Sequence, residues 1–352
     1  MRKTASALDV ADRRSANGSA RRAVVDYYDH CRDDYRILWR TDENGTIHFG
    51  FFDDGEHAST ATRALGIVSA AGTYFVGAVA AVSALIAVLT RTVWGRRKSV
   101  EWFRTAARGR AARHDAAQVR MMDVCARACG MRPGERVIDA GCGIGGTGLW
   151  LATHYGVKTL GLNVQPAHLH EARRRAAIHP AGSRVHFSAQ DFSEMGLVSG
   201  TIDVVWALES VCHCADKPAF LAEAYRVLRP GGRLMVADFF LPREDVAPGH
   251  RKAMRTWTSG WALPDLAAVP VFHRLLDECG FHDVTYRDIG RQVLPSSRRL
   301  YKASLVARPI DWVLSSIGAR SGLQRDNVRA AYYQYRTLRA GAWTYGLFVG
   351  RK

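Results

Sequence analysis

The 352-residue sequence has no pair of Cys-x-x-Cys motifs and no internal repeat. Its seven cysteines are odd in number, which is typical of reduced thiols in a cytosolic protein rather than of a disulfide framework. Cys212, His213 and Cys214 are close in sequence, but alternate residues of a strand point to opposite faces and no fourth ligand is evident. We therefore expect neither a metal site nor a repeat architecture.

Acidic residues are scarce relative to basic ones, because 33 Asp and Glu stand against 49 Lys and Arg, giving a formal net charge of +16. This excess favours an anionic partner, such as nucleic acid, acidic lipid headgroups or a phosphorylated substrate. Nucleic acid fits poorly, since the arginines are scattered and no nucleic-acid-binding motif is present. We therefore expect a membrane surface, rather than nucleic acid, among the partners.

The first 22 residues lack the continuous apolar run of a secretory signal, and their Arg, Ala and Ser content predicts a flexible basic tail. Residues 23–62 are rich in aromatic side chains and are expected to form a helical lid segment. Residues 63–98 hold a long apolar stretch with a basic flank. Residues 99–352 are expected to form the main domain, with a substrate lid at about 241–272.

From Arg136 onward, apolar strand patterns alternate with helical ones. The strand patterns lie at 136–141, 157–164, 184–191, 202–210 and 233–240, and two more follow near 281–290 and 342–352. Such alternation predicts an α/β fold with a parallel sheet, helices on both faces and a ligand at the carboxyl ends of the strands.

A glycine-rich loop, Gly141 to Gly146, follows the first of these strands and opens a helix, which is the context that a nucleotide-binding loop requires. Asp139 precedes it and can accept hydrogen bonds from a ligand ammonium or from loop amides. The second strand ends at Asn163, where a dinucleotide site needs Asp or Glu for the ribose. This difference disfavours a nicotinamide cofactor.

Together, the strings "VIDAGCGIGG", "GLNVQPAHLHEA", "AQDF" and "WALESVCHCADKPAFLAEAYRVLRPGGRLMVADFF" resemble the class I S-adenosylmethionine-dependent methyltransferases. More narrowly, they are similar to the sterol methyltransferase, tocopherol methyltransferase and cyclopropane fatty acid synthase group. The resemblance implies a Rossmann-like α/β fold with a seven-stranded, mostly parallel sheet, and S-adenosyl-L-methionine as cofactor. It assigns cofactor contacts to Asp139, Gly141, Gly143, Leu162, Asn163, Gln190, Asp191 and Phe192. His168 replaces a glutamine that the group often uses for a ribose contact.

Glu209 and His213 flank the end of the fourth strand, where a substrate should meet the methyl group. A carboxylate and a histidine can both accept a proton there, so we predict that they are catalytic. Methylating an alkene leaves a carbocation, which aromatic faces stabilise. The aromatic N-terminal segment is similar to the cavity lid of this group, which implies substrate contacts at Tyr27, Tyr35, Trp39, His48 and Phe51. Trp257 and Trp261 of the second lid are predicted to add to them.

The apolar stretch Ala64–Thr90 carries no charged residue and is long enough, at 1.5 Å per residue, to cross a ~30 Å hydrocarbon layer. A single crossing would put Tyr35 and His48 on the opposite side of the membrane from Glu209, whereas the resemblance places them around one cavity. We therefore favour a helix or hairpin that enters the cytoplasmic face of the membrane and leaves on the same side. A helix buried between subunits of a homo-oligomer, or a true span, is the alternative.

The sequence thus predicts a cytoplasmic, membrane-associated methyltransferase that acts on a lipid-like acceptor, terpenoid, sterol-like or fatty acyl, at a carbon atom. O- or N-methylation of an amphipathic natural product, and a membrane scaffold that binds the cofactor without turnover, are the alternatives.

Overall fold

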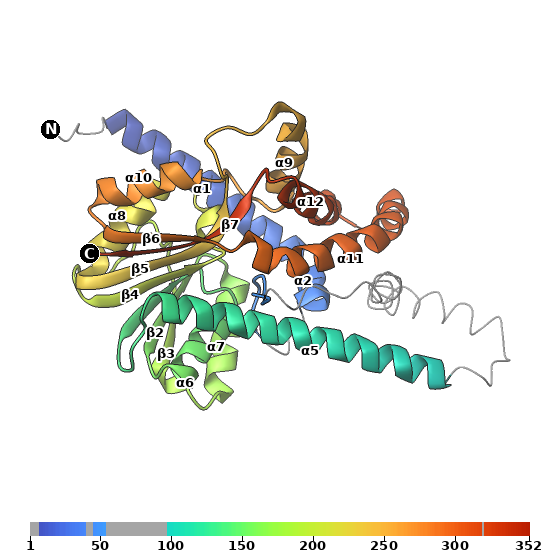
Figure 1. Cartoon of the computed structure of the whole chain (residues 1–352), viewed down its shortest axis with the longest axis horizontal. Coiled ribbons are helices and arrows are strands. Elements are labelled where there is room, and N and C mark those ends of the chain that lie inside the picture. Colours follow the sequence, from blue (N-terminus) through green and yellow to red (C-terminus); the bar gives the residue numbers. More distant parts are fainter. Residues whose placement is uncertain (1–6, 40–44, 54–96, 319) are drawn as a thin grey trace.

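The computed structural model describes residues 7–39, 45–53, 97–318 and 320–352 (Figure 1). The apolar stretch Ala64–Thr90 lies outside the described residues. Among the helices that are described, none combines the length and the apolar character that a membrane crossing needs.

One seven-stranded sheet forms the centre of the molecule (Figure 1). Its strands run in the order β3-β2-β1-β4-β5-β7-β6. The first five are parallel, and β7 lies antiparallel between β5 and β6. The strand bounds are Arg136–Ala140 (β1), Lys158–Asn163 (β2), Val185–Ala189 (β3), Ile202–Leu208 (β4), Leu228–Phe240 (β5), His282–Asp288 (β6) and Thr344–Arg351 (β7). The predicted seven-stranded, mostly parallel sheet is confirmed, and its order reverses between β1 and β4, where a ligand is expected.

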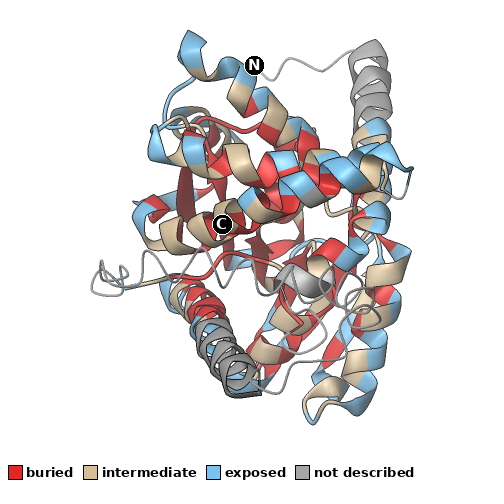
Figure 2. Ribbon diagram, turned by 90° about the vertical axis from the view of Figure 1, so that its right-hand side faces the viewer, coloured by how far each residue is buried: buried red, intermediate tan, exposed pale blue. Residues whose placement is uncertain are grey.

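Successive residues of the central strands feed two hydrophobic cores on opposite faces of the sheet. Val137 and Val204 belong to one core and their neighbours Ile138 and Val205 to the other. The first core includes residues from α5 (Arg97–Ala128) and α6 (Gly146–His154), and the second includes residues from α8 (Lys217–Val227) and α10 (Val269–Cys279). α7 (Pro166–Ile178) packs on β3. Figure 2 shows the buried strands between the outer helices.

The N-terminal region forms α1 (Ala7–His30) and α2 (Arg32–Trp39), and then an extended stretch over 45–53. The helix α1 thus begins within the tail that the sequence suggested was flexible. Alanine and arginine both have high helix propensity, so a basic Ala/Arg-rich segment can be helical as well as solvated.

The C-terminal region adds three helices, α9 (Pro248–Gly260), α11 (Gly290–Ser316) and α12 (Gly322–Arg339). Figure 1 shows them close together beyond one end of the sheet, and α12 packs against both α9 and α11. Of these, only α9 lies in the segment 241–272 that was predicted to be a lid. The sequence analysis predicted neither α11 nor α12.

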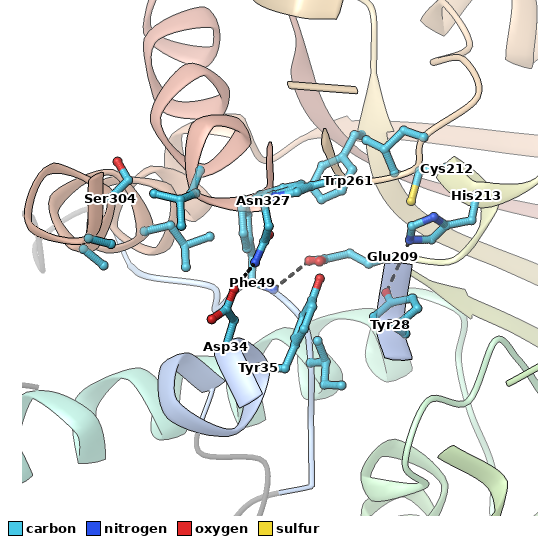
Figure 3. Close-up of a pocket in the computed structure, with 18 residues that line it drawn as sticks. Tyr28, Asp34, Tyr35, Phe49, Glu209, Cys212, His213, Trp261, Ser304 and Asn327 are labelled. Atoms are coloured by element: carbon cyan, nitrogen blue, oxygen red, sulfur yellow. Dashed lines mark hydrogen bonds between the residues drawn. The ribbon is translucent and has the colours of Figure 1, made fainter. Parts of the chain in front are cut away.

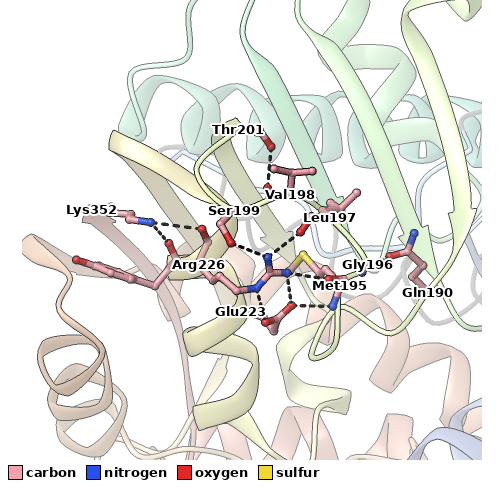
Figure 4. A network of polar contacts seen from close by, with 11 residues as sticks. Gln190, Met195, Gly196, Leu197, Val198, Ser199, Thr201, Glu223, Arg226 and Lys352 are labelled. Carbon is pink, nitrogen blue, oxygen red and sulfur yellow. Dashed lines mark hydrogen bonds and ion pairs between the residues drawn. The ribbon is translucent and has the colours of Figure 1, made fainter.

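A polar network fixes the loop after β3, which carries Asp191 (Figure 4). The Arg226 guanidinium donates to the carbonyls of Met195 and Leu197 at 2.8 and 2.7 Å, and Glu223 accepts from both the Arg226 guanidinium and the Met195 amide. Glu223 and Arg226 both belong to α8 and both bind backbone atoms of the loop. The helix α8 therefore holds this loop in position.

Candidate functional site

The glycine-rich loop leads from β1 into α6 and is held against the end of β2. The amides of Gly141 and Cys142 both donate to the carbonyl of Leu162, at 2.9 and 3.0 Å. Gly141 has a φ of 85°, and a Cβ at this position would collide with Ser210. Glycine is therefore needed at 141 for both backbone conformation and space.

Two further glycines of the loop, Gly143 and Gly146, have different surroundings. Gly143 has a φ of 51°, and nothing lies within 4 Å of the place where its Cβ would stand. Gly146 instead donates its amide to the carbonyl of Gly45 at 3.1 Å, and a Cβ would strike that carbonyl. Gly143 therefore leaves room for a ligand, whereas Gly146 admits the N-terminal segment.

The cavity beside Gly143, here called the loop pocket, has an empty volume of about 790 Å³, part of which is open to solvent. Five residues predicted to contact the cofactor line it: Gly141, Gly143, Asn163, Asp191 and Phe192. The helix α1 covers it with Arg21, Val24 and Tyr28, which the sequence analysis did not assign to this site. A Gln165 side chain joins α1 to α7, since its Nε2 donates to the Val25 carbonyl at 3.1 Å.

Three residues predicted to contact the cofactor do not line the loop pocket. Leu162 is fully buried and acts through its carbonyl. Gln190 braces its own loop by accepting the Gly196 amide at 2.9 Å. Asp139 is buried, its Oδ2 has no hydrogen-bond partner among the described residues, and burial raises its pKa to about 7. A buried carboxyl oxygen without a partner is costly, which is typical of a group that a ligand completes.

A second cavity, here called the aromatic pocket, adjoins the first and has an empty volume of about 740 Å³, part of which is open to solvent (Figure 3). Tyr35, Phe49 and Trp261 contribute aromatic faces to it. Both pockets are lined by Tyr28, Ile47, Glu209 and His213. The two cavities therefore meet at the predicted catalytic pair.

Glu209 lies just after β4 in a left-handed conformation, with a φ of 51°. Its Oε1 accepts the Phe49 amide at 2.6 Å and the Tyr345 hydroxyl at 2.8 Å. Burial raises the Glu209 pKa to about 8, although these two hydrogen bonds lower it. Strained backbone at a non-glycine residue is concentrated at functional sites, and here it aims a carboxyl group between the two pockets.

His213 lies near Glu209 on the shared wall, and its ring points toward Tyr28 (Figure 3). Its Nδ1 lies 3.3 Å from the Ala262 carbonyl, which can only accept, so the proton is assigned to Nδ1. Its Nε2 lies 3.4 Å from the Tyr28 hydroxyl. Burial lowers the His213 pKa to about 4, so the neutral ring keeps a lone pair on Nε2 at neutral pH.

Several predicted substrate residues are buried in the protein and do not line the aromatic pocket. Tyr27 is buried and donates to Asn327 at 2.9 Å, and its neighbour Tyr28 is the one that faces the cavity. Phe51 packs against α5, where its amide donates to the Ala117 carbonyl. His48 is buried, with its Nδ1 at 2.9 Å from the Phe49 carbonyl. Trp257 is fully buried against Trp261 and Trp343.

Of the predicted substrate residues, Tyr35 and Trp261 line the pocket, and the Trp39 side chain lies outside the described residues. Much of the remaining wall comes from α11 and α12, which sequence reasoning missed. These residues are Leu300, Ala303, Ser304, Ala307, Asn327, Val328 and Ala331. Asp34 also lines the pocket and lies in α2, within the predicted lid segment. The Ser321–Gln324 capping box at the start of α12 was a readable signal for one of these helices.

A family model described as a methyltransferase domain matches residues 137–232, which run from β1 into β5. The chain carries a class I S-adenosylmethionine-dependent methyltransferase domain. The predicted family is thus confirmed, and with it S-adenosylmethionine as the cofactor of the family. The residues present fit this cofactor. The loop pocket offers open space at Gly143, and Asp139, whose Oδ2 has no hydrogen-bond partner among the described residues, stands two residues before Gly141.

Named relatives of this methyltransferase domain match part of the chain. A 2-methyl-6-phytyl-1,4-hydroquinone methyltransferase of Synechocystis sp. is 32% identical over 47% of this chain and 52% of its own length. The sterol 24-C-methyltransferase of Saccharomyces cerevisiae is 30% identical over 46% of this chain and 43% of its own. The chain spans about half the length of the curated relatives it matches.

A solved structure extends the likeness of fold to nearly the whole chain. The geranyl diphosphate C-methyltransferase of Streptomyces coelicolor, in complex with Mg²⁺, geranyl diphosphate and S-adenosyl-L-homocysteine, superposes with a TM-score of 0.63. The match covers 94% of this chain and 97% of that one, at 14% identity. The methyltransferase domain and its added helices therefore share a fold with that enzyme.

Proposed function

We propose that this protein transfers a methyl group from S-adenosylmethionine to a carbon atom of a lipid-like acceptor, terpenoid, sterol-like or fatty acyl. The observation that carries the proposal is the shared wall of the two pockets, where Glu209 and His213 border both. Support comes from the largely apolar lining of the aromatic pocket and from relatives named for sterol and phytyl-hydroquinone acceptors.

When bound, S-adenosylmethionine supplies an electrophilic methyl group on a sulfonium. In carbon methylation the acceptor's π electrons form the new C–C bond, the methyl–sulfur bond breaks, and a cation remains on the acceptor. The faces of Tyr28, Phe49 and Trp261 can stabilise that cation, by up to ~2 kcal/mol each when desolvated. Ionised Glu209 then takes the proton whose loss restores a neutral product, while its Oε1 stays oriented by Phe49 and Tyr345.

The second candidate is O-methylation or N-methylation of an amphipathic acceptor. One observation favours it: His213, on the pocket wall, keeps an unprotonated Nε2 next to the Tyr28 hydroxyl, held in that tautomer by the Ala262 carbonyl. Such a nitrogen can accept a hydroxyl proton, although its low pKa makes it a weak base.

The test is transfer of an isotopically labelled methyl group into a total lipid extract, followed by mass spectrometry of the labelled product. Gly143→Val should abolish transfer, because a side chain would enter the open space of the loop pocket. Gly134→Val is the matched control, since Gly134 has a φ of 82°, the same open surroundings and no place in either pocket. Cofactor binding without any labelled product would instead favour the non-catalytic scaffold.

We further propose that the protein works at the cytoplasmic face of a membrane, docking through the exposed side of α11. Trp312 is 73% exposed on that helix, beside exposed Leu305 and Val313, and Ile317, which caps its C-terminal end, is 71% exposed. The same helix lines the aromatic pocket with Leu300 and Ala303. Apolar side chains on a strongly basic protein suit an anionic lipid surface.

Flotation with vesicles of anionic lipid checks this docking. Trp312→Ser with Ile317→Ser should reduce the bound fraction at least about threefold, since each replaced side chain loses its burial in lipid. Ile178→Ser with Val198→Ser, at positions 78% and 74% exposed elsewhere, should leave it unchanged. If the first pair instead shifts a dimer to monomer in sedimentation and flotation stays unchanged, the exposed face is a subunit interface.

A further inference from the structure

The two ends of the aromatic pocket differ in chemistry (Figure 3). Glu209 and His213 lie at the end shared with the loop pocket. Asp34, Asn327 and Ser304 lie toward the other end, here called the far end. Apolar side chains of α11 and α12, such as Leu300 and Val328, fill the wall of the cavity. An acceptor that spans the pocket therefore meets a second polar surface away from the reacting atoms.

The far end is a buried hydrogen-bond network that holds Asp34 in place. Arg320 Nη2 donates to both carboxylate oxygens of Asp34, at 2.9 and 2.8 Å. Asn327 Nδ2 donates to Asp34 Oδ2 at 3.1 Å, and Asn327 Oδ1 accepts the Tyr27 hydroxyl at 2.9 Å. With its position fixed by three hydrogen bonds from two side chains, the Asp34 carboxylate is a preorganised acceptor for a ligand.

Positive charge at this end is already neutralised. Arg320 also lies 3.0 Å from the Asp311 carboxylate, so one guanidinium faces two carboxylates. Arg325 and Asp326, both in α12, place one positive and one negative charge near the Asp311 carboxyl group. None of the described residues that line the pocket is Lys or Arg, and Asp34 and Glu209 are its only carboxylates. An anionic group placed here would meet a carboxylate and, among the described lining residues, no Lys or Arg.

We propose that the acceptor carries an uncharged, hydrogen-bond-donating head group, such as a hydroxyl, which binds Asp34 and Asn327 at the far end. Its apolar body then extends to Glu209 and His213. This inference rests on the proposed function. A phosphate or carboxylate head is disfavoured, because no Lys or Arg among the described lining residues would offset its desolvation and because Asp34 would repel it. The described residues also include no cluster of three His, Cys, Asp or Glu that could supply a bridging metal ion.

The test uses four probes with one farnesyl tail and different heads: farnesol, farnesylamine, farnesoic acid, and farnesyl diphosphate with Mg²⁺. Each is titrated calorimetrically into the full chain saturated with S-adenosylhomocysteine, so methyl transfer plays no part. Farnesol should bind at least about tenfold more tightly than the acid and the diphosphate, the size expected when one buried charge lacks a partner.

A variant series ties this preference to the far end. In Asp34→Asn the guanidinium of Arg320 loses one of its two carboxylates, so the ratio between farnesol and farnesoic acid should fall at least about fivefold. Glu244→Gln removes a carboxylate from an exposed pair with Arg274 and should leave the ratio unchanged.

Three results would overturn the proposal: an anionic probe that binds as well as farnesol, farnesylamine that binds tenfold better than farnesol, or no probe binding while S-adenosylhomocysteine does bind. The binding of the four probes to the wild-type protein tests the proposal even if Asp34→Asn fails to fold. Failure of the proposed function is seen separately, as intact probe binding without transfer of labelled methyl.

Discussion

Glu209→Gln should lower kcat at least about 100-fold while cofactor affinity changes less than about threefold, because general-base catalysis contributes factors of this size. Glutamine keeps the side-chain length and can still accept from Phe49 and Tyr345 through its carbonyl oxygen. What it loses is the ability to take a proton from the acceptor. Steady-state methyl transfer, with calorimetric cofactor titration, separates the two effects.

The pH dependence of the same reaction gives an independent check. With a Glu209 pKa of about 8, the carboxyl group is mostly protonated at neutral pH and ionises as the pH rises. Activity that needs the carboxylate should therefore increase from pH 6 to pH 9, and Glu209→Gln should flatten this rise. Tyr345→Phe removes a hydrogen bond that lowers the Glu209 pKa, so it should move the rise to higher pH.

Glu244→Gln, at an exposed carboxylate far from both pockets, is the control for these measurements. A Glu209→Gln enzyme with kcat within threefold of the wild type would remove Glu209 from the mechanism. His213 would then be the remaining base on the shared wall.

The parallel part of the fold could be read from the sequence because each signal is local. A buried strand, a glycine turn and a helix recur over short windows, and β1, β2 and β4 lie within a residue or two of the expected strands. Chain topology then brings their carboxyl ends to one edge, which is why Gly143, Asn163 and Glu209 could be placed together without seeing the structure.

The far wall of the site could not be read in this way. α11 contains Pro295 and Pro309, and proline ordinarily signals the end of a helix. The contact between Asp34 and Arg320 joins residues 286 positions apart, and no local pattern encodes that distance. The choice between Tyr27 and Tyr28 depends on the rotation of one helix by a single residue.

Buried histidines should make the protein sensitive to acid. Burial lowers the pKa of His48, His168 and His213 to about 4, against 6.5 for an unperturbed histidine. The unfolded chain therefore takes up protons at a higher pH than the folded one. The stability tied to the neutral rings is complete above pH 6.5 and is lost as the pH falls toward 4. Asp139 and Glu209 act in the opposite sense, since their raised pKa values penalise folding as the pH rises toward 7 and 8.

His48 offers the sharpest measurement, because it is only 2% exposed and lines neither pocket. The lowered pKa of His48 alone predicts that the free energy of unfolding falls by about 2 kcal/mol between pH 7 and pH 5. In His48→Asn the side-chain amide can replace Nδ1 as the donor to the Phe49 carbonyl. The free energy of unfolding of this variant should therefore fall by about 2 kcal/mol less than that of the wild type between pH 7 and pH 5. Urea unfolding at the two pH values measures the difference, with His282→Asn at an exposed position of β6 as control. Equal losses in wild type and His48→Asn would show that His48 becomes protonated without unfolding, so that the acid sensitivity lies with the other buried histidines, His114 among them.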